Sequence, residues 1–290
     1  MTAIETGLQD LKRQHPEWEP WLAVVQEVLS ETTNPGWDAC VPVRTEAHQS
    51  KVPLLAGITL ALDKRSVHHL LEKLIRIAHR SGTPKMASLE PALHADLDFL
   101  NLFKASLCQD SDRLKEIAAD LGADSEAFQA VAALLPIPLL NACNRRWASS
   151  KPVSWVEGYC PVCGAWPAFA EVRGIERSRF FRCGRCGGEW PAHCLFCPYC
   201  GMTDPNELVS LVPEKSGATG VIDACKRCLG YTKTFTTLQG SQPAKVLLDD
   251  LASAHLDIAA LEQGYKRPQA TGYSLDVRVT DNGKAWRRFF

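Results

Sequence analysis

Four Cys-x-x-Cys pairs within 69 residues constrain the fold of this 290-residue chain more than any other feature. A gap of two residues lets the backbone turn so that both thiolates point at one metal ion. Glycine follows the second cysteine in the first three pairs and eases that turn, whereas Leu229 intervenes before Gly230 in the fourth. The pairs are Cys160/Cys163, Cys183/Cys186, Cys197/Cys200 and Cys225/Cys228.

The spacing of these pairs predicts two four-sulfur sites. Nineteen residues separate the first pair from the second and 24 separate the third from the fourth, but only ten lie between the second and the third. A tetrahedral site needs two such turns that face each other across a hairpin. The first predicted site consists of Cys160, Cys163, Cys183 and Cys186, and the second of Cys197, Cys200, Cys225 and Cys228.

The sequence leaves the identity of the metal open. Four thiolates suit both zinc and iron, so the expected cofactors are two metal ions, iron or zinc. Disulfides are the alternative, but four Cys-x-x-Cys pairs so close together favour metal. Cys194, three residues before Cys197, could be a fifth thiolate or part of an iron–sulfur arrangement. Because four ligands already close the site, we expect Cys194 to be a spare thiol.

Charge and hydropathy exclude several classes of protein. The net charge of −1 argues against a protein that mainly grips nucleic acid or anionic lipid, because such proteins carry a large positive excess. The opening sequence MTAIETGLQD lacks the basic start and apolar run of a signal peptide. The longest apolar stretch, residues 53–62, is about half of the roughly 20 residues that a spanning helix needs. We therefore expect a cytoplasmic protein with no membrane partner, in a compartment where clustered cysteines are more often metal ligands than disulfides.

The pattern of residue types divides the chain. Apolar residues recur at helical spacing through the first 150 residues, where Ser66 and Asp110 are expected to cap helices. From about Ser149 the sequence is rich in glycine, proline, cysteine and aromatic residues, with β-prone runs at 169–172 and 179–182. Small ribbons have this composition because a bound ion replaces part of the core. The helical pattern returns after Pro243.

The expected fold class is therefore α+β. We expect a helical domain at residues 1–150, a first four-cysteine module at 151–195 and a second at 196–270. The second module is expected to end in a C-terminal helix. The remaining residues, 271–290, lack a clear period and are expected to form a partly disordered tail.

Polar residues near the cysteine pairs have competing interpretations. Arginines on the first hairpin, set against Glu171 and Glu176, are either a docking surface for a client peptide or nucleic acid, or a solvated hairpin face. They are Arg173, Arg177, Arg179, Arg182 and Arg185. Tyr231 and Lys233 share a strand face and either touch a client or form ordinary strand surface, which we favour. Trp190 is expected to pack under the metal loop.

Signatures of catalysis are absent from the sequence. It contains no Walker-type loop, no G-x-G-x-x-G, no His-Glu-x-x-His and no G-x-S-x-G. A metal site closed by four thiolates also lacks the open coordination position that metal catalysis requires. We therefore expect that the protein is not an enzyme.

Motif order adds a resemblance that covers residues 159–268. The motifs are Cys-Pro-Val-Cys-Gly at 160–164, Arg-Cys-Gly-Arg-Cys-Gly-Gly-Glu-Trp at 182–190, two further cysteine pairs, Tyr-Thr-Lys at 231–233, Asp-Asp-Leu-Ala-Ser at 249–253 and Leu-Glu-Gln-Gly-Tyr at 261–265. In this order they resemble the formate dehydrogenase accessory protein family, the FdhE type. The resemblance implies a helical amino-terminal domain, two rubredoxin-like modules that bind iron or a related metal, and a cytoplasmic location. It also implies a role in maturing the catalytic subunit of respiratory formate dehydrogenases before export.

Three functional classes follow from these observations. The first is a non-catalytic, chaperone-like assembly factor whose partner is the formate dehydrogenase catalytic subunit. The second is a nucleic-acid-binding zinc-ribbon protein, which the arginines would support, salt-sensitive binding to DNA or RNA would reveal, and the net charge disfavours. The third is a rubredoxin-like electron-transfer protein, which needs iron and a visible spectrum that changes reversibly on reduction.

Overall fold

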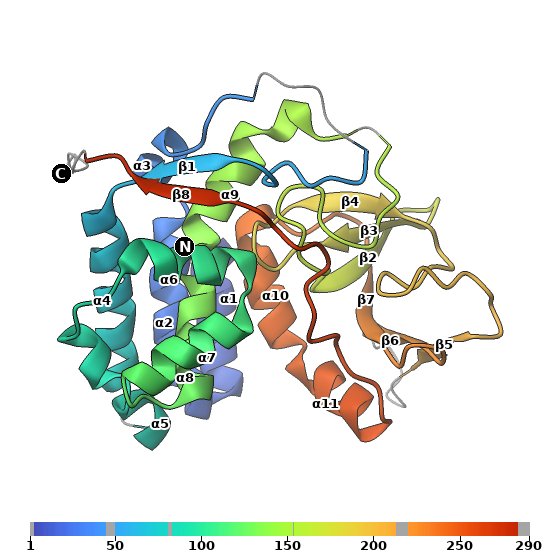
Figure 1. Ribbon diagram of the computed structural model, residues 1–290. Coiled ribbons are helices and arrows are strands. Elements are labelled where there is room, and N and C mark those ends of the chain that lie inside the picture. Colours follow the sequence, from blue (N-terminus) through green and yellow to red (C-terminus); the bar gives the residue numbers. More distant parts are fainter. Residues whose placement is uncertain (1–2, 45–49, 81–82, 153, 213–219, 284–290) are drawn as a thin grey trace. The chain divides into compact units, whose positions relative to one another are not determined.

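The computed structural model describes residues 3–44, 50–80, 83–152, 154–212 and 220–283 (Figure 1). These residues form two compact units. The first contains residues 3–44, 56–146 and 275–283, and the second contains residues 50–55 and 147–274 of the described chain. The α+β fold class is confirmed, with helices in the first unit and the cysteine-rich sheet in the second.

The first unit is built mainly from α-helices. Side-chain oxygens of Asp98, Asp110 and Asp124 accept backbone N–H groups at the starts of three of them, so the cap expected at Asp110 is confirmed. The cap expected at Ser66 is wrong. Asp63 accepts the N–H of Arg65 at 3.1 Å and the hydroxyl of Ser66 at 2.8 Å. The helices are α1 (Ala3–Gln14), α2 (Glu19–Glu31), α3 (Pro35–Ala39), α4 (Lys64–Arg80), α5 (Pro84–Ala87), α6 (Phe99–Cys108), α7 (Ser111–Asp120), α8 (Ser125–Leu134) and α9 (Ile137–Arg146).

The most apolar part of the first unit is the stretch 125–146, which holds α8 and α9. In the described chain this is the single stretch that is long and apolar enough to cross a membrane, and 78% of its most apolar window is buried inside the structure. Leu139, Leu140 and Cys143 are completely buried there. This stretch is longer than the apolar run at 53–62. It does not stand out in the sequence as one apolar run, because polar residues interrupt it.

Two strands complete the first unit, and one of them lies within the expected tail. Strand β1 (Thr59–Leu62) pairs in parallel with β8 (Arg278–Asp281), and Figure 1 shows the two arrows side by side. Val277 is fully buried just before β8. The described part of the expected tail is therefore ordered, and residues 284–290 lie outside the described residues.

The second unit centres on one six-stranded sheet. Its order is β4-β3-β2-β7-β6-β5, and every neighbouring pair is antiparallel except β2 and β7, which are parallel. Each half is therefore a three-strand meander, and the first strand of one half pairs with the last strand of the other. The strands are β2 (Phe169–Arg173), β3 (Ser178–Arg182), β4 (Glu189–Ala192), β5 (Leu208–Leu211), β6 (Gly220–Cys225) and β7 (Tyr231–Thr237).

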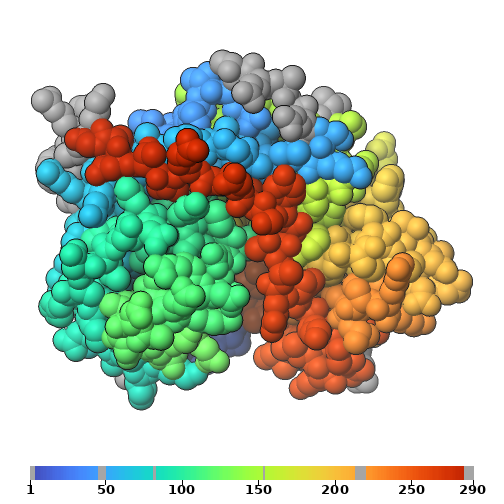
Figure 2. Space-filling view, viewed as in Figure 1, coloured from blue at the N-terminus to red at the C-terminus, as the bar shows by residue number. Residues whose placement is uncertain are grey.

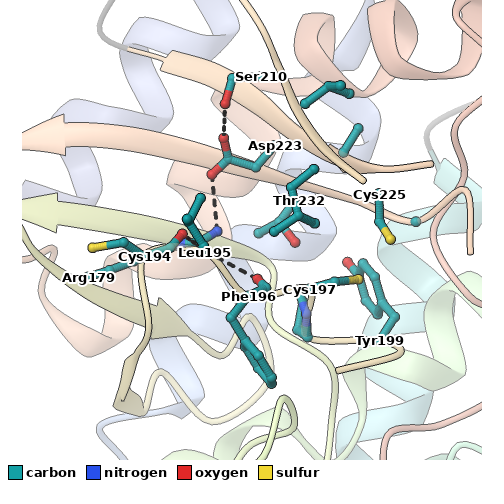
Figure 3. A pocket seen from close by; sticks show the side chains of 15 residues that line it. Arg179, Cys194, Leu195, Phe196, Cys197, Tyr199, Ser210, Asp223, Cys225 and Thr232 are labelled. Atoms are coloured by element: carbon teal, nitrogen blue, oxygen red, sulfur yellow. Dashed lines mark hydrogen bonds and ion pairs between the residues drawn. The ribbon is translucent and has the colours of Figure 1, made fainter. Parts of the chain in front are cut away.

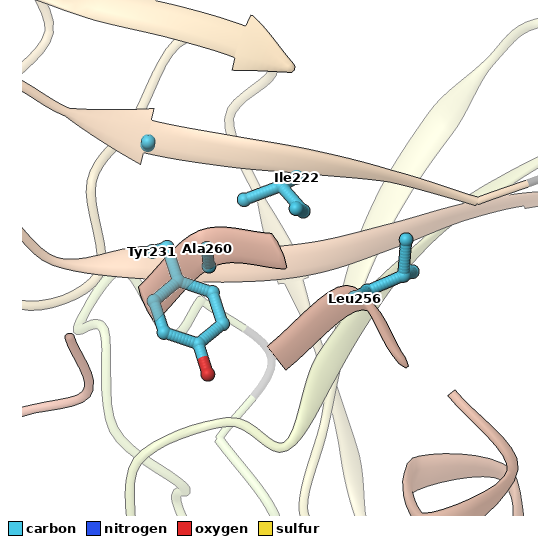
Figure 4. Close-up of a cluster of buried hydrophobic side chains, with 5 residues drawn as sticks. Ile222, Tyr231, Leu256 and Ala260 are labelled. Carbon is cyan, nitrogen blue, oxygen red and sulfur yellow. The ribbon is translucent and has the colours of Figure 1, made fainter. Parts of the chain in front are cut away.

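The expected C-terminal helix is present as two short helices, α10 (Val246–Ala252) and α11 (Ala254–Glu262). The hydroxyl of Ser253 separates them by donating to the carbonyl oxygens of Asp249 and Asp250. Leu256 and Ala260 of α11 pack on buried residues of β6 and β7 (Figure 4). Ile258 and Leu261 of α11 are exposed. Figure 2 shows the orange-red atoms of this segment at the molecular surface.

The shared sheet bears on the division of the cysteine-rich region. Both halves contribute three strands to it, and the backbones of β2 and β7 join them from Phe169 to Arg173. The four segments expected from the sequence, with boundaries at 150, 195 and 270, stay a prediction. In the structure, the two metal-binding halves lie within one compact unit.

Candidate metal sites

The structure brings the cysteine pairs together in the combination that their spacing predicts. The sulfurs of Cys160, Cys163, Cys183 and Cys186 all lie within 4.8 Å of one another, and so do those of Cys197, Cys200, Cys225 and Cys228. Each pair lies in a turn at the end of the sheet, so the two turns of one half face each other. We call the first of these groups site one and the second site two.

The sulfur separations fit tetrahedral coordination. The S···S distances are 3.5 Å for Cys160–Cys186 and Cys163–Cys183 at site one. At site two they are 3.6 Å for Cys197–Cys228 and 3.7 Å for Cys200–Cys225. With metal–sulfur bonds of about 2.3 Å, a regular tetrahedron has edges of about 3.8 Å, whereas a disulfide bond is about 2.0 Å long. The eight thiols are not joined as disulfides, and their geometry suits two metal ions.

Backbone N–H groups point at the sulfurs, as a thiolate site requires. The N–H of Val162 lies 3.4 Å from the Cys160 sulfur, and the N–H of Gly188 lies 3.4 Å from that of Cys186. At site two the N–H of Gly230 approaches the Cys228 sulfur at 3.4 Å. These donors stabilise negative charge on sulfur and so favour the ligand form of the cysteine.

The pKa values of the cysteines indicate that four adjacent thiolates need a bound positive ion. Burial raises the pKa of the Cys160 thiol well above its usual value. Hydrogen bonds from the other three thiols hold the pKa of Cys183 well below its usual value. At site two, burial raises the pKa of Cys228 to about 11. One thiolate can thus be stabilised by its neighbours, but holding four together needs the positive charge of a bound ion.

Left-handed backbone conformations close all four turns. Gly164, Gly187 and Gly201 have φ angles of 71°, 69° and 72°, which confirms why glycine follows the first three pairs. Leu229 occupies the same place in the fourth turn with a φ of 57°. The following Gly230 is needed for a different reason, because a Cβ atom there would overlap the ring of Tyr199.

Most of the hairpin arginines form ion pairs with acidic side chains of the protein itself. Arg182 is 1% exposed and donates to Glu171 at 3.0 Å, and Arg173 bridges Glu171 and Glu189. Burial raises the pKa of Glu171, but hydrogen bonds from Ser241 and the two arginines outweigh it, so its pKa is lowered overall. The hairpin is therefore neither a free basic docking surface nor a simply solvated face.

Arg179 extends the same pattern toward the second half of the sheet. It is 5% exposed, pairs with Asp223 at 3.1 Å, and donates to the carbonyl oxygen of Cys194 at 3.0 Å. Thr234 also donates to Asp223, at 2.6 Å. These contacts fasten the linker between the two sites onto the sheet.

Tyr231 and Lys233 are buried, so the expectation of ordinary strand surface or client contact is wrong. The Lys233 ammonium is 0% exposed and lies 2.6 Å from Asp250 and 2.7 Å from Asp257. The Tyr231 hydroxyl donates to Asp257 at 2.6 Å, and Arg267 pairs with both aspartates. Burial raises the pKa of Asp257, but these cations and the hydroxyl outweigh it and lower the pKa overall.

The remaining aromatic and thiol predictions can now be placed. Trp190 is 2% exposed, and its indole N–H donates to the carbonyl oxygen of Glu157, three residues before Cys160, at 3.2 Å. Cys194 is exposed and belongs to neither four-sulfur group. Figure 3 shows its sulfur pointing away from those of Cys197 and Cys225. Asp223, Asp257 and Arg267 were not singled out from the sequence, because only the strand pairing reveals what they face.

Comparisons with known proteins agree with this architecture. No family model matches the chain. An FdhE homologue of Aquifex aeolicus is 24% identical over 246 residues, covering 76% of this chain and 82% of the relative. The FdhE protein of Escherichia coli O127:H6 is 25% identical over 260 residues, covering 85% of this chain and 77% of the relative. The crystal structure of FdhE from Pseudomonas aeruginosa matches with a TM-score of 0.60 at 20% identity, covering 92% of this chain and 93% of that chain.

The chain is similar to FdhE proteins in sequence over most of its length, and it shares the fold of the Pseudomonas aeruginosa FdhE crystal structure. The resemblance carried by the ordered motifs at 159–268 is thereby confirmed. The FdhE fold extends over the helical half as well, since the structural match covers nearly the whole of both chains. A second FdhE homologue, from Pseudomonas aeruginosa, is 33% identical over 114 residues, which is 37% of this chain.

Proposed function

We propose that this protein is a non-catalytic assembly factor that binds the catalytic subunit of a respiratory formate dehydrogenase in the cytoplasm during its maturation. The observation that carries the proposal is the likeness to FdhE proteins over 246 and 260 residues, which cover 76% and 85% of this chain. The closed four-sulfur groups support it, because a metal held by four thiolates has no open position for a substrate.

Exposed apolar side chains give the cysteine-rich unit a means of holding an immature protein. Leu195, Val212 and Leu229 are 51%, 68% and 46% exposed. All three lie in the second half of this unit, close in sequence to site-two cysteines or to β5. Exposed leucine and valine side chains bind apolar surface that is still uncovered in a client before it is fully folded.

Co-purification from a host that respires formate tests the proposal. Tagged wild-type protein is expected to retain the formate dehydrogenase catalytic subunit, identified by mass spectrometry. A variant carrying Leu195→Ser and Leu229→Ser is expected to retain less of it. Val43→Ser is the matched control, because Val43 is a 79% exposed apolar residue of the helical unit. Wild-type protein that retains none of the subunit would overturn the proposal.

The structure also bears on the nucleic-acid alternative. A phosphate-binding surface needs arginines whose guanidinium groups are free to reach the backbone of DNA or RNA. Arg179 and Arg182 are buried against acidic partners, and Arg173 is held by two glutamates. The hairpin that motivated this alternative thus offers little free positive charge.

A further inference from the structure

The two four-sulfur sites differ in their access to solvent. All four cysteines of site one are 0% exposed. At site two, Cys197 and Cys225 are 4% and 1% exposed, but Cys228 is half-buried and Cys200 is exposed. The difference therefore lies in the outer cysteine of each turn, which is covered at site one and open at site two.

The residues packed over the turns explain this difference. The N–H groups of Leu54 and Leu55 donate to the carbonyl oxygens of Pro161 and Val162, so a separate segment lies along the first turn of site one. A Cβ atom added to Gly164 would lie 2.9 Å from the Cβ of Tyr273, and one added to Gly187 would overlap Pro243.

The equivalent positions at site two are open. A Cβ atom added to Gly201 would meet nothing within 4 Å. In the fourth turn the corresponding residue is Leu229, whose side chain is nearly half exposed. Segments from elsewhere in the unit therefore cover the closing glycines of both turns of site one. In the third turn Gly158 and Trp166 contact only the inner residues, Pro198 and Tyr199, and Gly201 beside the exposed Cys200 has no such cover among the described residues.

A hollow in the surface reaches site two from a second direction. It holds about 460 Å³ of space, part of it open to solvent, and lies between the linker 194–198 and the strands β5 and β6. Cys197 and Cys225 line it, and Figure 3 shows their sulfurs close together on the side opposite that of Cys194. The site-one cysteines do not line this hollow.

From these differences we propose that the two sites have unequal roles: site one holds its ion permanently as part of the fold, and site two exchanges its ion with thiol or chelating ligands from solution. The exposed Cys200 and the half-buried Cys228 are the first sulfurs to be displaced. Metal transfer at site two thus becomes an activity of the folded protein, independent of the identity of the client.

The chemistry of ligand exchange explains why access from solvent to the sulfurs determines the role of each metal site. An incoming donor atom forms one bond to the ion while one cysteine thiolate leaves, and the released thiolate takes a proton from water; no atom is oxidised or reduced. The incoming donor must approach within bonding distance before the thiolate has left. Four sulfurs that are completely covered exclude such a donor until the unit opens by local unfolding, which is slow for a tightly packed segment.

Zinc release to 4-(2-pyridylazo)resorcinol from the zinc-loaded full-length protein tests this proposal. The absorbance of the chelator complex is expected to rise in two phases, with one zinc ion per chain released in the fast phase. Cys200→Ser should remove the fast phase and leave the slow one. Cys163→Ser is the matched control, since Cys163 occupies the same place in site one, and it should remove the slow phase instead. Release of both ions in one phase, or a fast phase that survives Cys200→Ser, would overturn the proposal.

A second measurement keeps the test decisive if a variant fails to fold. Wild-type protein is treated with the same chelator and with pulses of iodoacetamide, and alkylated cysteines are located by mass spectrometry. Cys194 should react at once, because it is exposed and outside both sites. Site-two cysteines are expected to become alkylated next, well before those of site one. Alkylation of Cys160 or Cys183 together with Cys200 would contradict unequal roles.

Discussion

Leu229 is the exception among the residues that close the four cysteine turns, since the other three are glycines. A leucine with a φ of 57° is strained, because the left-handed conformation costs an L-residue with a Cβ atom roughly 1–2 kcal/mol. Its side chain is also 46% exposed, so little burial offsets the strain. The three glycines at the equivalent positions avoid this cost. A strained and exposed leucine is consistent with the client contact that we propose for this residue.

Replacing this leucine by glycine is expected to stabilise the protein. Leu229→Gly removes the left-handed strain but adds the backbone entropy of a glycine, so the free energy of unfolding should rise by about 0.5–1 kcal/mol. Leu229→Ala keeps the strain and should bring no gain. Urea unfolding of the zinc-loaded proteins, followed by tryptophan fluorescence, measures the difference. If the glycine variant is less stable than the alanine variant, the left-handed strain is not what limits this turn.

Individual side chains show where sequence reasoning reaches its limit. The glycines at 164, 187 and 201 could be predicted, because a tight turn around an ion needs a left-handed residue whatever its surroundings. Leu229 departs visibly from the glycine pattern in the sequence, but its strain depends on the backbone conformation, which the sequence alone does not reveal. Asp63 and Ser66 can both cap a helix, and only the start of α4 at Lys64 decides in favour of Asp63.

At the scale of elements, strand β7 and helices α10 and α11 are fastened by a buried charge network. Lys233 projects from β7 and meets Asp250 of α10 and Asp257 of α11. A completely buried ammonium group is costly unless its charge and its three donors are satisfied, and here a carbonyl oxygen of Asp250 at 2.8 Å supplies the third acceptor. The network thereby fixes both helices over one face of the sheet.

Removing the lysine charge is therefore expected to loosen these helices. Lys233→Met leaves Asp250 and Asp257 partly buried with one cation fewer, and should lower the free energy of unfolding by about 3 kcal/mol. Lys245→Met is the matched control, because Lys245 also pairs with an aspartate of α10 but is 36% exposed. Its loss should cost less than about 0.5 kcal/mol. Chemical unfolding of both variants measures the costs, and equal costs would show that burial of Lys233 adds nothing.

Elements were predicted more readily than their partners. The β-prone runs at 169–172 and 179–182 became β2 and β3, because phenylalanine and valine favour extended backbone and signal a strand locally. The parallel pairing of β2 with β7 joins residues more than 60 positions apart, and no local pattern signals it. Strands β1 and β8 were missed for the same reason, since four residues give too short a pattern and their partners are distant in sequence.

At the scale of the whole molecule, the two units depend on different sources of stability. The helical unit buries a core of leucine, valine and phenylalanine side chains, such as Leu22, Val28 and Phe103, which needs no ion. The other unit is a thin sheet with two four-sulfur groups at its turns, where bound ions replace core that the sequence does not supply. The two kinds of unit were recognisable from composition alone. No local pattern in the sequence indicates that residues 50–55 group with the sheet unit and residues 275–283 with the helical unit.

Removal of the metal is therefore expected to unfold one unit before the other. Treatment of the zinc-loaded protein with a strong chelator in mild urea should destroy the sheet unit, since its thiolates repel one another once the ions are gone. Most of the far-ultraviolet helical signal should persist, because α1 to α9 lie in the helical unit. Limited proteolysis should then cut first within residues 154–212 and 220–274, and later within α2, α4 and α9. The same treatment without chelator is the control and should leave both units intact. Simultaneous loss of the helical signal and of the sheet unit would mean that the helices depend on the metal-bound sheet, and that neither unit is stable by itself.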